Sequence, residues 1–145
     1  MMEESKELLK SLGIPVIQSP AEAEAQCSFI AEKGDAWAVV SQDADTLLYE
    51  APRLIKNLTV SQRRRLPSGA YVTIKPELIE LKEVLKTLDI KQDQLLALAI
   101  LTGTDYNRKG VKGIGQKTAL KLVKQYKNFD NMFKDVNAGF NWKKV

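Results

Sequence analysis

The sequence has no histidine and only one cysteine, Cys27, among its 145 residues. This excludes disulfide frameworks, zinc sites built from cysteine and histidine, and nucleophilic catalysis by Ser-His-Asp or Cys-His groups. Any catalysis must therefore use carboxylates, lysines, tyrosines or bound metal ions. Cys27 falls within a predicted helix, where we expect it to be a small buried side chain.

Long apolar runs are also absent, although 44% of the residues are apolar. No segment approaches the roughly 20 consecutive apolar residues of a membrane-spanning helix. The N-terminus, Met1–Lys6, lacks the basic and apolar parts of a signal peptide. We therefore expect a soluble, intracellular protein without a membrane partner. Its length suits one hydrophobic core with an appendage.

Basic residues outnumber acidic ones by 22 to 18, so the net charge is +4. Setting aside the five carboxylates discussed below leaves 13 acidic residues against the 22 basic ones, a balance of +9. A basic surface around a small acidic hole is expected of a metal-dependent nuclease. An ordinary, slightly basic domain fits the net charge equally well.

Strand and helix patterns alternate in the first third of the chain. Apolar spacing predicts a helix over 4–12 that ends at Gly13, followed by a short strand at 15–17. The apolar run 36–40 predicts a strand that is buried on both faces. Strands that alternate with helices indicate an α/β fold with a mostly parallel sheet.

A second helix is predicted over 20–33, ending at Gly34. Ser19 is a suitable N-cap, Pro20 occupies the favoured first helical position, and Glu22 completes a capping box. Trp37, Tyr49, Phe129 and Phe133 are expected in the core rather than as platforms on which bases stack.

The second half is predicted to contain a hairpin and then helices. Strands at 54–60 and 70–74 would flank a basic tip over 62–69. Helices are predicted at 78–88, 92–101 and 117–126, and the pattern fades after Asp135.

Three acidic motifs follow apolar segments. Asp43 and Asp45 come after the strand at 36–40, and residues two apart in an extended chain point to the same side. They would project at the carboxyl edge of the sheet, where open α/β proteins bind ligands. The alternative is that Asp43 caps the helix that follows.

Glu22 and Glu24 fall in the first turn of their predicted helix, where carboxylates are also favoured by the helix dipole. Residues two apart on a helix do not share a face, so Glu24 is the better candidate for direct metal contact. Asp105 follows the C-terminus of an apolar helix. An acid there opposes the dipole, which favours a functional role.

Two basic regions are candidate phosphate contacts. Gly113 and Gly115 precede a helix, and glycines there let a DNA backbone approach the helix N-terminus, with Lys117 and Lys121 nearby. A single Gly-x-Gly is common in turns, however. The run Arg63–Arg65 is a second candidate, although charged runs at a hairpin tip are usually solvated.

These motifs resemble, in their order and spacing, the internal nuclease region of flap endonuclease, in its archaeal form, a family of the 5′-nuclease superfamily. The resemblance extends from about Glu4 to Asp135. It rests on Leu12–Pro15, Ser19–Cys27, Val40–Tyr49, Gly103–Tyr106 and Gly113–Gly115.

The resemblance implies a PIN-like twisted, mostly parallel sheet flanked by helices, followed by a helix-two-turn-helix element. Residues 1–101 would form the nuclease core, 102–135 the DNA-binding element and 136–145 a tail. The implied activity is 5′-flap endonuclease and 5′ to 3′ exonuclease action on flapped or nicked DNA in replication and repair. The expected location is the cytoplasm in an archaeon, or the nucleus in a eukaryote.

The resemblance also implies the ligands of the site. Two magnesium ions would be held by five residues that are both metal ligands and catalytic residues: Glu22, Glu24, Asp43, Asp45 and Asp105. The helix-two-turn-helix would hold the duplex through Gly113, Gly115, Lys117 and Lys121, often with a monovalent cation. Arg63, Arg64 and Arg65 are candidate phosphate contacts because of their charge, and not because of the resemblance.

The family pattern also has parts that this sequence does not match. They include an N-terminal region with two further aspartate ligands and a tail that binds the sliding clamp. We therefore expect duplex binding, weak metal affinity and little or no cleavage by this chain alone. The alternatives are a DNA-binding module without hydrolysis, or a structural domain whose carboxylates are caps and turns.

Overall fold

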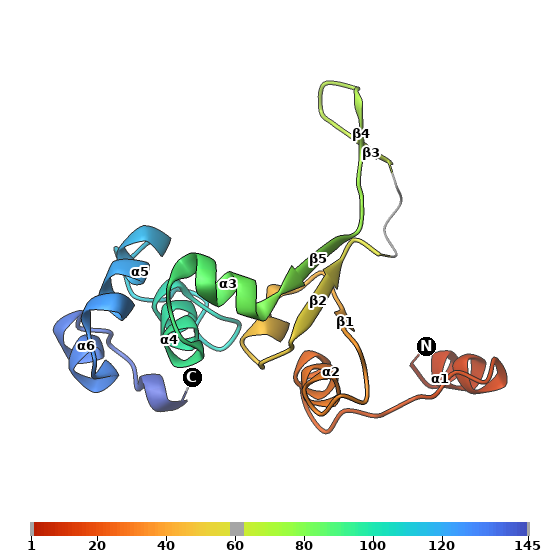
Figure 1. Cartoon of the computed structure of the whole chain (residues 1–145), viewed down its shortest axis with the longest axis horizontal. Helices are drawn as coiled ribbons and strands as arrows, with labels where there is room; N and C mark the ends of the chain where they lie inside the picture. The colour runs from red at the N-terminus through yellow and green to blue at the C-terminus, as the bar shows by residue number, and fades with distance from the viewer. Residues whose placement is uncertain (1, 59–62, 145) are drawn as a thin grey trace.

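The computed structural model describes residues 2–58 and 63–144 (Figure 1). Helices flank a small sheet, which confirms the α/β class. No helix in these two ranges combines the length and apolar character needed to cross a membrane. In chain order the elements are α1 (Met2–Ser11), α2 (Ala23–Glu32), β1 (Val39–Val40), the 3-10 helix η1 (Ala44–Leu47), β2 (Arg53–Lys56), β3 (Arg63–Arg65), β4 (Tyr71–Thr73), β5 (Glu77–Glu80), α3 (Leu81–Leu88), α4 (Gln92–Thr102), α5 (Gln116–Gln125), α6 (Phe129–Asp135) and the 3-10 helix η2 (Trp142–Lys144).

The main sheet has the strand order β1-β2-β5 and is mixed. Strand β1 runs parallel to β2, with Val39 opposite Leu54, whereas β5 runs antiparallel to β2, with Ile79 opposite Leu54. The strand predicted at 36–40 is reduced to Val39–Val40, and the expectation that it is buried on both faces was wrong. Val39 packs with Ala31 of α2 and is 5% exposed, but Val40 is 49% exposed because it points to the opposite face.

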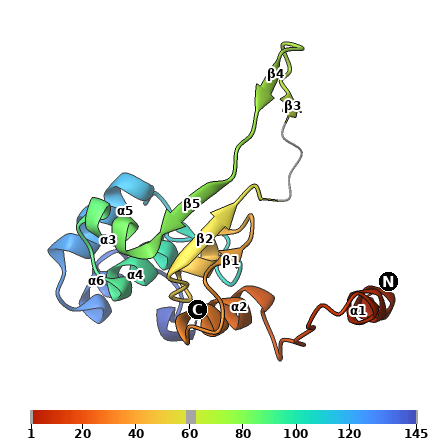
Figure 2. The same cartoon turned by 45° about the vertical axis from the view of Figure 1, so that its right-hand side comes forward.

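The predicted hairpin exists with its predicted second strand, but its first strand is a different one. Strand β3 pairs antiparallel with β4, with Arg64 opposite Val72, and Gly69 in the turn has a φ of +84°. The arginines therefore lie in a strand instead of at the tip, and the strand predicted at 54–60 pairs with β1 and β5. Its last two residues fall outside the described ranges. Figure 2 shows the hairpin standing away from the main sheet.

The helix predicted at 78–88 begins later, because its first residues form strand β5. Leu78 and Ile79 pair with β2, and the amide of Leu81, the first residue of α3, donates to the Pro52 carbonyl at 3.1 Å. Backbone pairing with a strand far along the chain thus overrides the local helical spacing.

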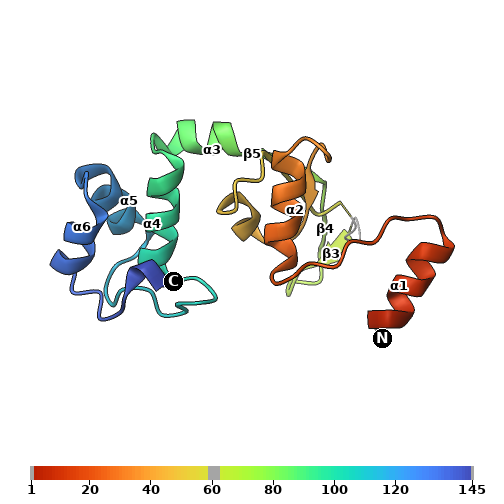
Figure 3. The ribbon, with the colours of Figure 1, turned by 90° about the horizontal axis from the view of Figure 1, so that it is seen from below.

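Helix α1 ends as predicted, at Gly13. The Ile14 amide donates to the Leu9 carbonyl at 2.9 Å and the Gly13 amide to the Lys10 carbonyl at 3.0 Å, with Gly13 at a φ of +72°. These are the two bonds of a Schellman motif. The strand predicted at 15–17 is not formed; an extended segment leads to α2, and Figure 3 shows α1 apart from the other helices.

Helix α2 starts at Ala23, three residues later than predicted. The Ser19 hydroxyl accepts from the Ala21 amide at 3.3 Å and donates to the Glu22 carbonyl at 2.9 Å, so it stabilises a turn before the helix and not the helix itself. Cys27 is exposed, contrary to expectation.

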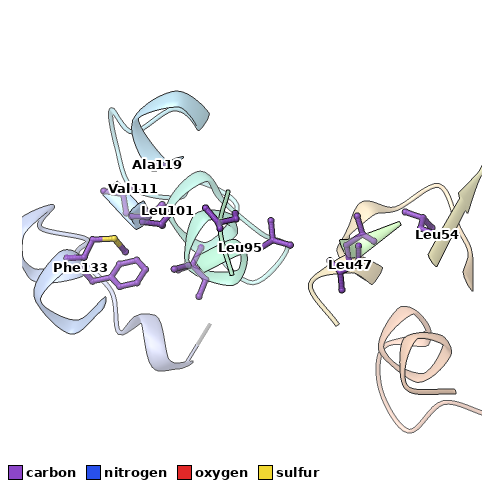
Figure 4. Packing of buried hydrophobic residues seen from close by; sticks show 13 residues of the cluster. Leu47, Leu54, Leu95, Leu101, Val111, Ala119 and Phe133 are labelled. Carbon is purple, nitrogen blue, oxygen red and sulfur yellow. The ribbon is translucent and has the colours of Figure 1, made fainter. Parts of the chain in front are cut away.

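The largest hydrophobic core lies among the C-terminal helices. Helices α4 and α5 occupy nearly the predicted ranges, and Leu101, Ala119, Val123 and Met132 are each fully buried. The cluster also includes residues of η1, β2 and α3, so it joins the sheet to the helices (Figure 4).

The segment after α6 packs against this core. The Trp142 ring stacks on Phe133 with 5.0 Å between ring centroids, and its Nε1 donates to Asp130 at 3.1 Å. Phe133 is 4% exposed, as expected of a core aromatic, but Trp37 is 60% exposed and therefore not a core residue.

Candidate metal centre and nucleic-acid interface

The carboxylates of the three acidic motifs line one depression. It has a volume of about 190 Å³, and its walls also include Tyr49 and Tyr106. The carboxylates come from α2, from η1 and the residue before it, and from the loop between α4 and α5. The structure thus brings together the predicted residues Glu22, Glu24, Asp43, Asp45 and Asp105.

Glu22 and Glu24 reach the depression from the start of α2. Glu22 is the N-cap residue, with an extended backbone at φ −68° and ψ 128°, and its side chain makes no capping hydrogen bond. Because Glu22 lies outside the helix, the helical spacing that separates residues two apart does not apply to this pair.

A buried hydrogen bond fixes α2 against η1. The Ser28 hydroxyl donates to the Thr46 carbonyl at 3.1 Å, and both residues are fully buried. Ser28 lies one helical turn after Glu24, and Thr46 follows Asp45. This bond therefore sets the spacing between the α2 side and the η1 side of the depression.

Asp43 has a structural role as well. Its Oδ1 accepts from the Asp45 amide at 3.0 Å and so caps η1, which is the alternative that the sequence left open. The cap turns the chain, so Asp45 lies in a 3-10 helix and not in an extended strand as expected. Both residues nevertheless line the depression.

The charges in the depression repel one another. The pKa of Asp45 is raised, first by partial burial and then by the negative charges of Asp43, Asp105 and Glu24. Four carboxylates from three parts of the chain are therefore close enough to disfavour one another's ionisation. A bound cation would relieve this repulsion.

The loop after α4 places Asp105 at the depression. Gly103 ends α4 with a φ of +117°, and Gly110 returns the chain so closely that a Cβ there would lie 2.5 Å from the Leu101 carbonyl oxygen. The Val111 amide donates to that carbonyl at 2.8 Å, and Asn107 Nδ2 donates to the Ile100 carbonyl at 3.1 Å.

Two tyrosines of the depression were not predicted as site residues. The Tyr106 hydroxyl donates to Glu22 Oε1 at 3.0 Å, and the hydrogen bonds with Glu22 and Tyr49 raise the pKa of Tyr106 to about 12. Tyr49, expected in the core, is 37% exposed and lines the depression. One signal for Tyr106 is present in the sequence, because this residue directly follows Asp105.

The donors suit a hard divalent cation, which takes oxygen ligands. Among the residues that the structure describes, however, no three carboxylates are gathered closely enough to hold an ion as they stand. Magnesium commonly keeps several waters and binds through one or two carboxylates together with substrate phosphates. The spread arrangement therefore suits a divalent cation that keeps part of its water shell.

The candidate phosphate contacts lie in two separate places. Gly113 has a φ of +83°, Gly115 is the N-cap of α5, and a Cβ on either glycine would meet nothing within 4 Å. Lys117 and Lys121 are exposed on α5. The Arg63–Arg65 strand belongs to the projecting hairpin (Figure 2).

Comparisons with known proteins agree with this arrangement. The family model described as XPG I-region matches residues 13–105. Flap endonuclease 1 of Staphylothermus marinus is 56% identical over 135 residues, which are 92% of this chain and 39% of that protein. The chain thus spans about two fifths of the length of this relative.

Solved structures give the same result. The flap endonuclease-1 of Methanococcus jannaschii superposes with a TM-score of 0.82 and 46% identity, over 99% of this chain and 41% of that one. The catalytic core of Rad2 in complex with a DNA substrate gives a TM-score of 0.74 and 29% identity, over 92% and 38%. The resemblance to flap endonuclease that the motifs indicated is confirmed, and the chain belongs to the XPG I-region family.

Proposed function

We propose that this chain is the internal part of a structure-specific 5′-flap endonuclease and 5′ to 3′ exonuclease, which hydrolyses DNA phosphodiesters in replication and repair. The observation that carries the proposal is the convergence of five carboxylates from three parts of the chain on one depression. The relatives named flap endonuclease 1 support the substrate class.

In this proposal the carboxylates of the depression hold two magnesium ions, directly or through water. When bound, such ions stabilise charge on a scissile phosphate and lower the pKa of a bound water. The chain's own contribution is to place the ligands. Ser28 fixes α2 against η1, the Asp43 cap orients Asp45, and the Tyr106 hydroxyl holds the Glu22 carboxylate.

The duplex would be held by the start of α5. Its first-turn amides lack partners within the helix, and a helix N-terminus favours anions. The open backbone at Gly113 and Gly115 lets a phosphate approach, and the exposed Lys117 and Lys121 supply positive charge. These contacts would position DNA without reading its sequence.

A second candidate function is DNA binding without hydrolysis. It is favoured by the observation that, in the described part of the chain, no three carboxylates stand close enough to hold an ion. In that case the depression would take up no metal at useful concentrations, whereas α5 would still bind DNA.

Manganese titration by calorimetry separates these two functions. Asp45→Asn removes the negative charge of the carboxylate whose pKa is raised by partial burial and by the charges of Asp43, Asp105 and Glu24. Asp35→Asn removes one negative charge from an exposed loop and is the control. We expect the wild-type chain and Asp35→Asn to bind manganese equally, and Asp45→Asn to bind at least about tenfold more weakly. Equal binding by all three proteins would argue against a metal site in the depression.

A further inference from the structure

An apolar pocket adjoins the acidic depression. It has a volume of about 250 Å³ and shares Asp45, Tyr49 and Tyr106 with the depression. Its other walls come from η1, α4, the loop after α4 and the C-terminal segment, through Leu48, Leu96, Ile100, Thr104, Trp142 and Lys143. The two tyrosines therefore form a boundary between an acidic compartment and an apolar one.

The walls of this pocket are held by contacts of their own. Trp142 is fixed by its stack on Phe133, with centroids 5.0 Å apart, and by its hydrogen bond to Asp130. Ile100 is 5% exposed and belongs to the core, whereas Leu96 is 46% exposed. The pocket is thus formed before any ligand arrives, with Leu96 as its most accessible aliphatic wall.

The charges of the walls argue against an anion as the occupant. Lys143 is the one cation in the lining, and its Nζ is already paired with Asp130 Oδ2 at 3.0 Å. Asp45 contributes negative charge at the boundary. A phosphate would therefore find no free cation among these lining residues, whereas a flat, uncharged ring would find aromatic and aliphatic walls.

We propose that the pocket binds one unpaired nucleobase of the DNA strand whose phosphate lies at the acidic depression. This inference rests on the proposed function. The bases on either side of a phosphate are flat rings with polar edges, and bases stack on aromatic side chains with little dependence on sequence. A base in a duplex is covered by its neighbours, so the pocket selects DNA whose strand is opened at this point.

The test uses Trp142 as a reporter. The chain has two tryptophans, and Trp37→Phe removes the exposed one that lies outside the pocket. In this background, a duplex with a 5′ overhang of thymidines and a matched duplex with abasic residues in the overhang are titrated with magnesium present. We expect the thymidine overhang to bind about tenfold more tightly, to quench Trp142 fluorescence and to shield Trp142 from acrylamide.

Two leucine variants locate the effect. Leu96→Arg fills the pocket, and Leu8→Arg makes the same change on an exposed leucine of α1. We expect the difference in affinity between the thymidine and abasic overhangs to disappear in Leu96→Arg and to persist in Leu8→Arg. The acrylamide measurement needs no pocket variant, so it decides the matter even if Leu96→Arg does not fold.

The outcomes separate the two proposals. Equal affinity for both DNAs, with Trp142 fluorescence unchanged, would overturn the base pocket and leave duplex binding by α5 intact. If the preference for the thymidine overhang were lost equally in Leu96→Arg and Leu8→Arg, the proposed base-binding pocket would also be overturned. If neither DNA bound to the unmodified chain, the base pocket and the proposed function would both fail.

Discussion

At the scale of single residues, a few side chains outside the acidic motifs determine the shape of the depression. Tyr106 joins the loop after α4 to the start of α2 through a hydrogen bond that spans 84 positions of the sequence. Gly110 lets the same loop pass against the end of α4. Neither role is visible in local sequence patterns, because each depends on a partner elsewhere in the fold.

Removing the Tyr106 hydroxyl tests its positioning role. We expect Tyr106→Phe to weaken manganese binding severalfold while the thermal midpoint stays close to wild type, because the hydrogen bond is exposed and orients Glu22 more than it stabilises the fold. Tyr71→Phe, on the exposed face of β4, is the control. Manganese titration and thermal unfolding of the three proteins provide the measurement, and unchanged affinity in Tyr106→Phe would contradict the role.

Gly110→Ala tests the close approach of the loop. The added Cβ would lie 2.5 Å from the Leu101 carbonyl oxygen, and the φ of +52° is itself unfavourable for alanine. We expect a loss of about 3 kcal/mol in the free energy of unfolding. Gly34 also has a positive φ, of +86°, but open space around it, so Gly34→Ala should lose about 1 kcal/mol. Urea unfolding measures the free energy of unfolding of both variants. Equal losses would show that the close approach of Gly110 to the Leu101 carbonyl does not affect stability.

At the scale of elements, α5 is the proposed anchor for DNA and the segment after α6 forms a wall of the apolar pocket. The α5 helix could be predicted from sequence because its apolar spacing is strong and local, and α4 because its continuous apolar run is long enough for a buried helix. Strand β5 could not, since the helical spacing of its residues is overridden by pairing with β2. The start of α2 was misplaced because Ser19 hydrogen-bonds within a turn that precedes the helix.

The candidate site likewise contains residues that could be predicted from sequence and residues that could not. The five carboxylates could be found from sequence because the order and spacing of their motifs resemble those of flap endonuclease, whereas the Glu22/Glu24 and Asp43/Asp45 motifs alone also fit helix caps and turns. Tyr49 was assigned to the core because an aromatic residue among apolar neighbours is usually buried there. Its position at the boundary of two compartments depends on packing between η1 and α4, which no local pattern encodes.

The lysines of α5 allow a quantitative test of DNA binding. We expect Lys117→Ala combined with Lys121→Ala to reduce the slope of log affinity against log salt by about 2, since each phosphate contact contributes about 0.9. Lys82→Ala and Lys86→Ala, two exposed lysines four apart on α3, form a matched control that should leave the slope unchanged. Fluorescence anisotropy with a short duplex over a salt series gives the slopes.

Asp130 connects stability to pH. The Lys143 ammonium, and then the Trp142 indole, hold the pKa of this carboxyl below its ordinary value, so the folded state favours the ionised form. The contribution of Asp130 to the free energy of unfolding is therefore present above its unfolded-state pKa of about 3.9. It is lost as the pH falls through the lower pKa of the folded state. The urea midpoint of Asp130→Asn should differ from wild type near neutral pH and converge with it toward pH 3, whereas Asp35→Asn should differ little throughout.

At the scale of the whole molecule, one hydrophobic cluster connects the sheet to the C-terminal helices. The two sides of the depression are thus parts of one folded unit, although the carboxylates remain spread. The chain also spans only 39% of the length of flap endonuclease 1 of Staphylothermus marinus.

We expect this chain alone to bind a flapped duplex and to cleave it slowly or not at all. The physical reason is that spread, mutually repelling carboxylates bind the ions weakly without further ligands. A cleavage assay with an end-labelled 5′-flap substrate in magnesium measures this, with Asp45→Asn as the background. Rapid turnover that Asp45→Asn abolishes would show that the five carboxylates suffice.

Among the α-helices of the described ranges, α1 alone buries none of its residues. Its backbone hydrogen bonds are therefore protected by helix formation alone and not by the core. Amide hydrogens of α1 should exchange with deuterium orders of magnitude faster than those of α4, and a protease should remove α1 while the remaining chain keeps its unfolding temperature. The first cut in limited proteolysis would then mark where the cooperative unit of this protein begins.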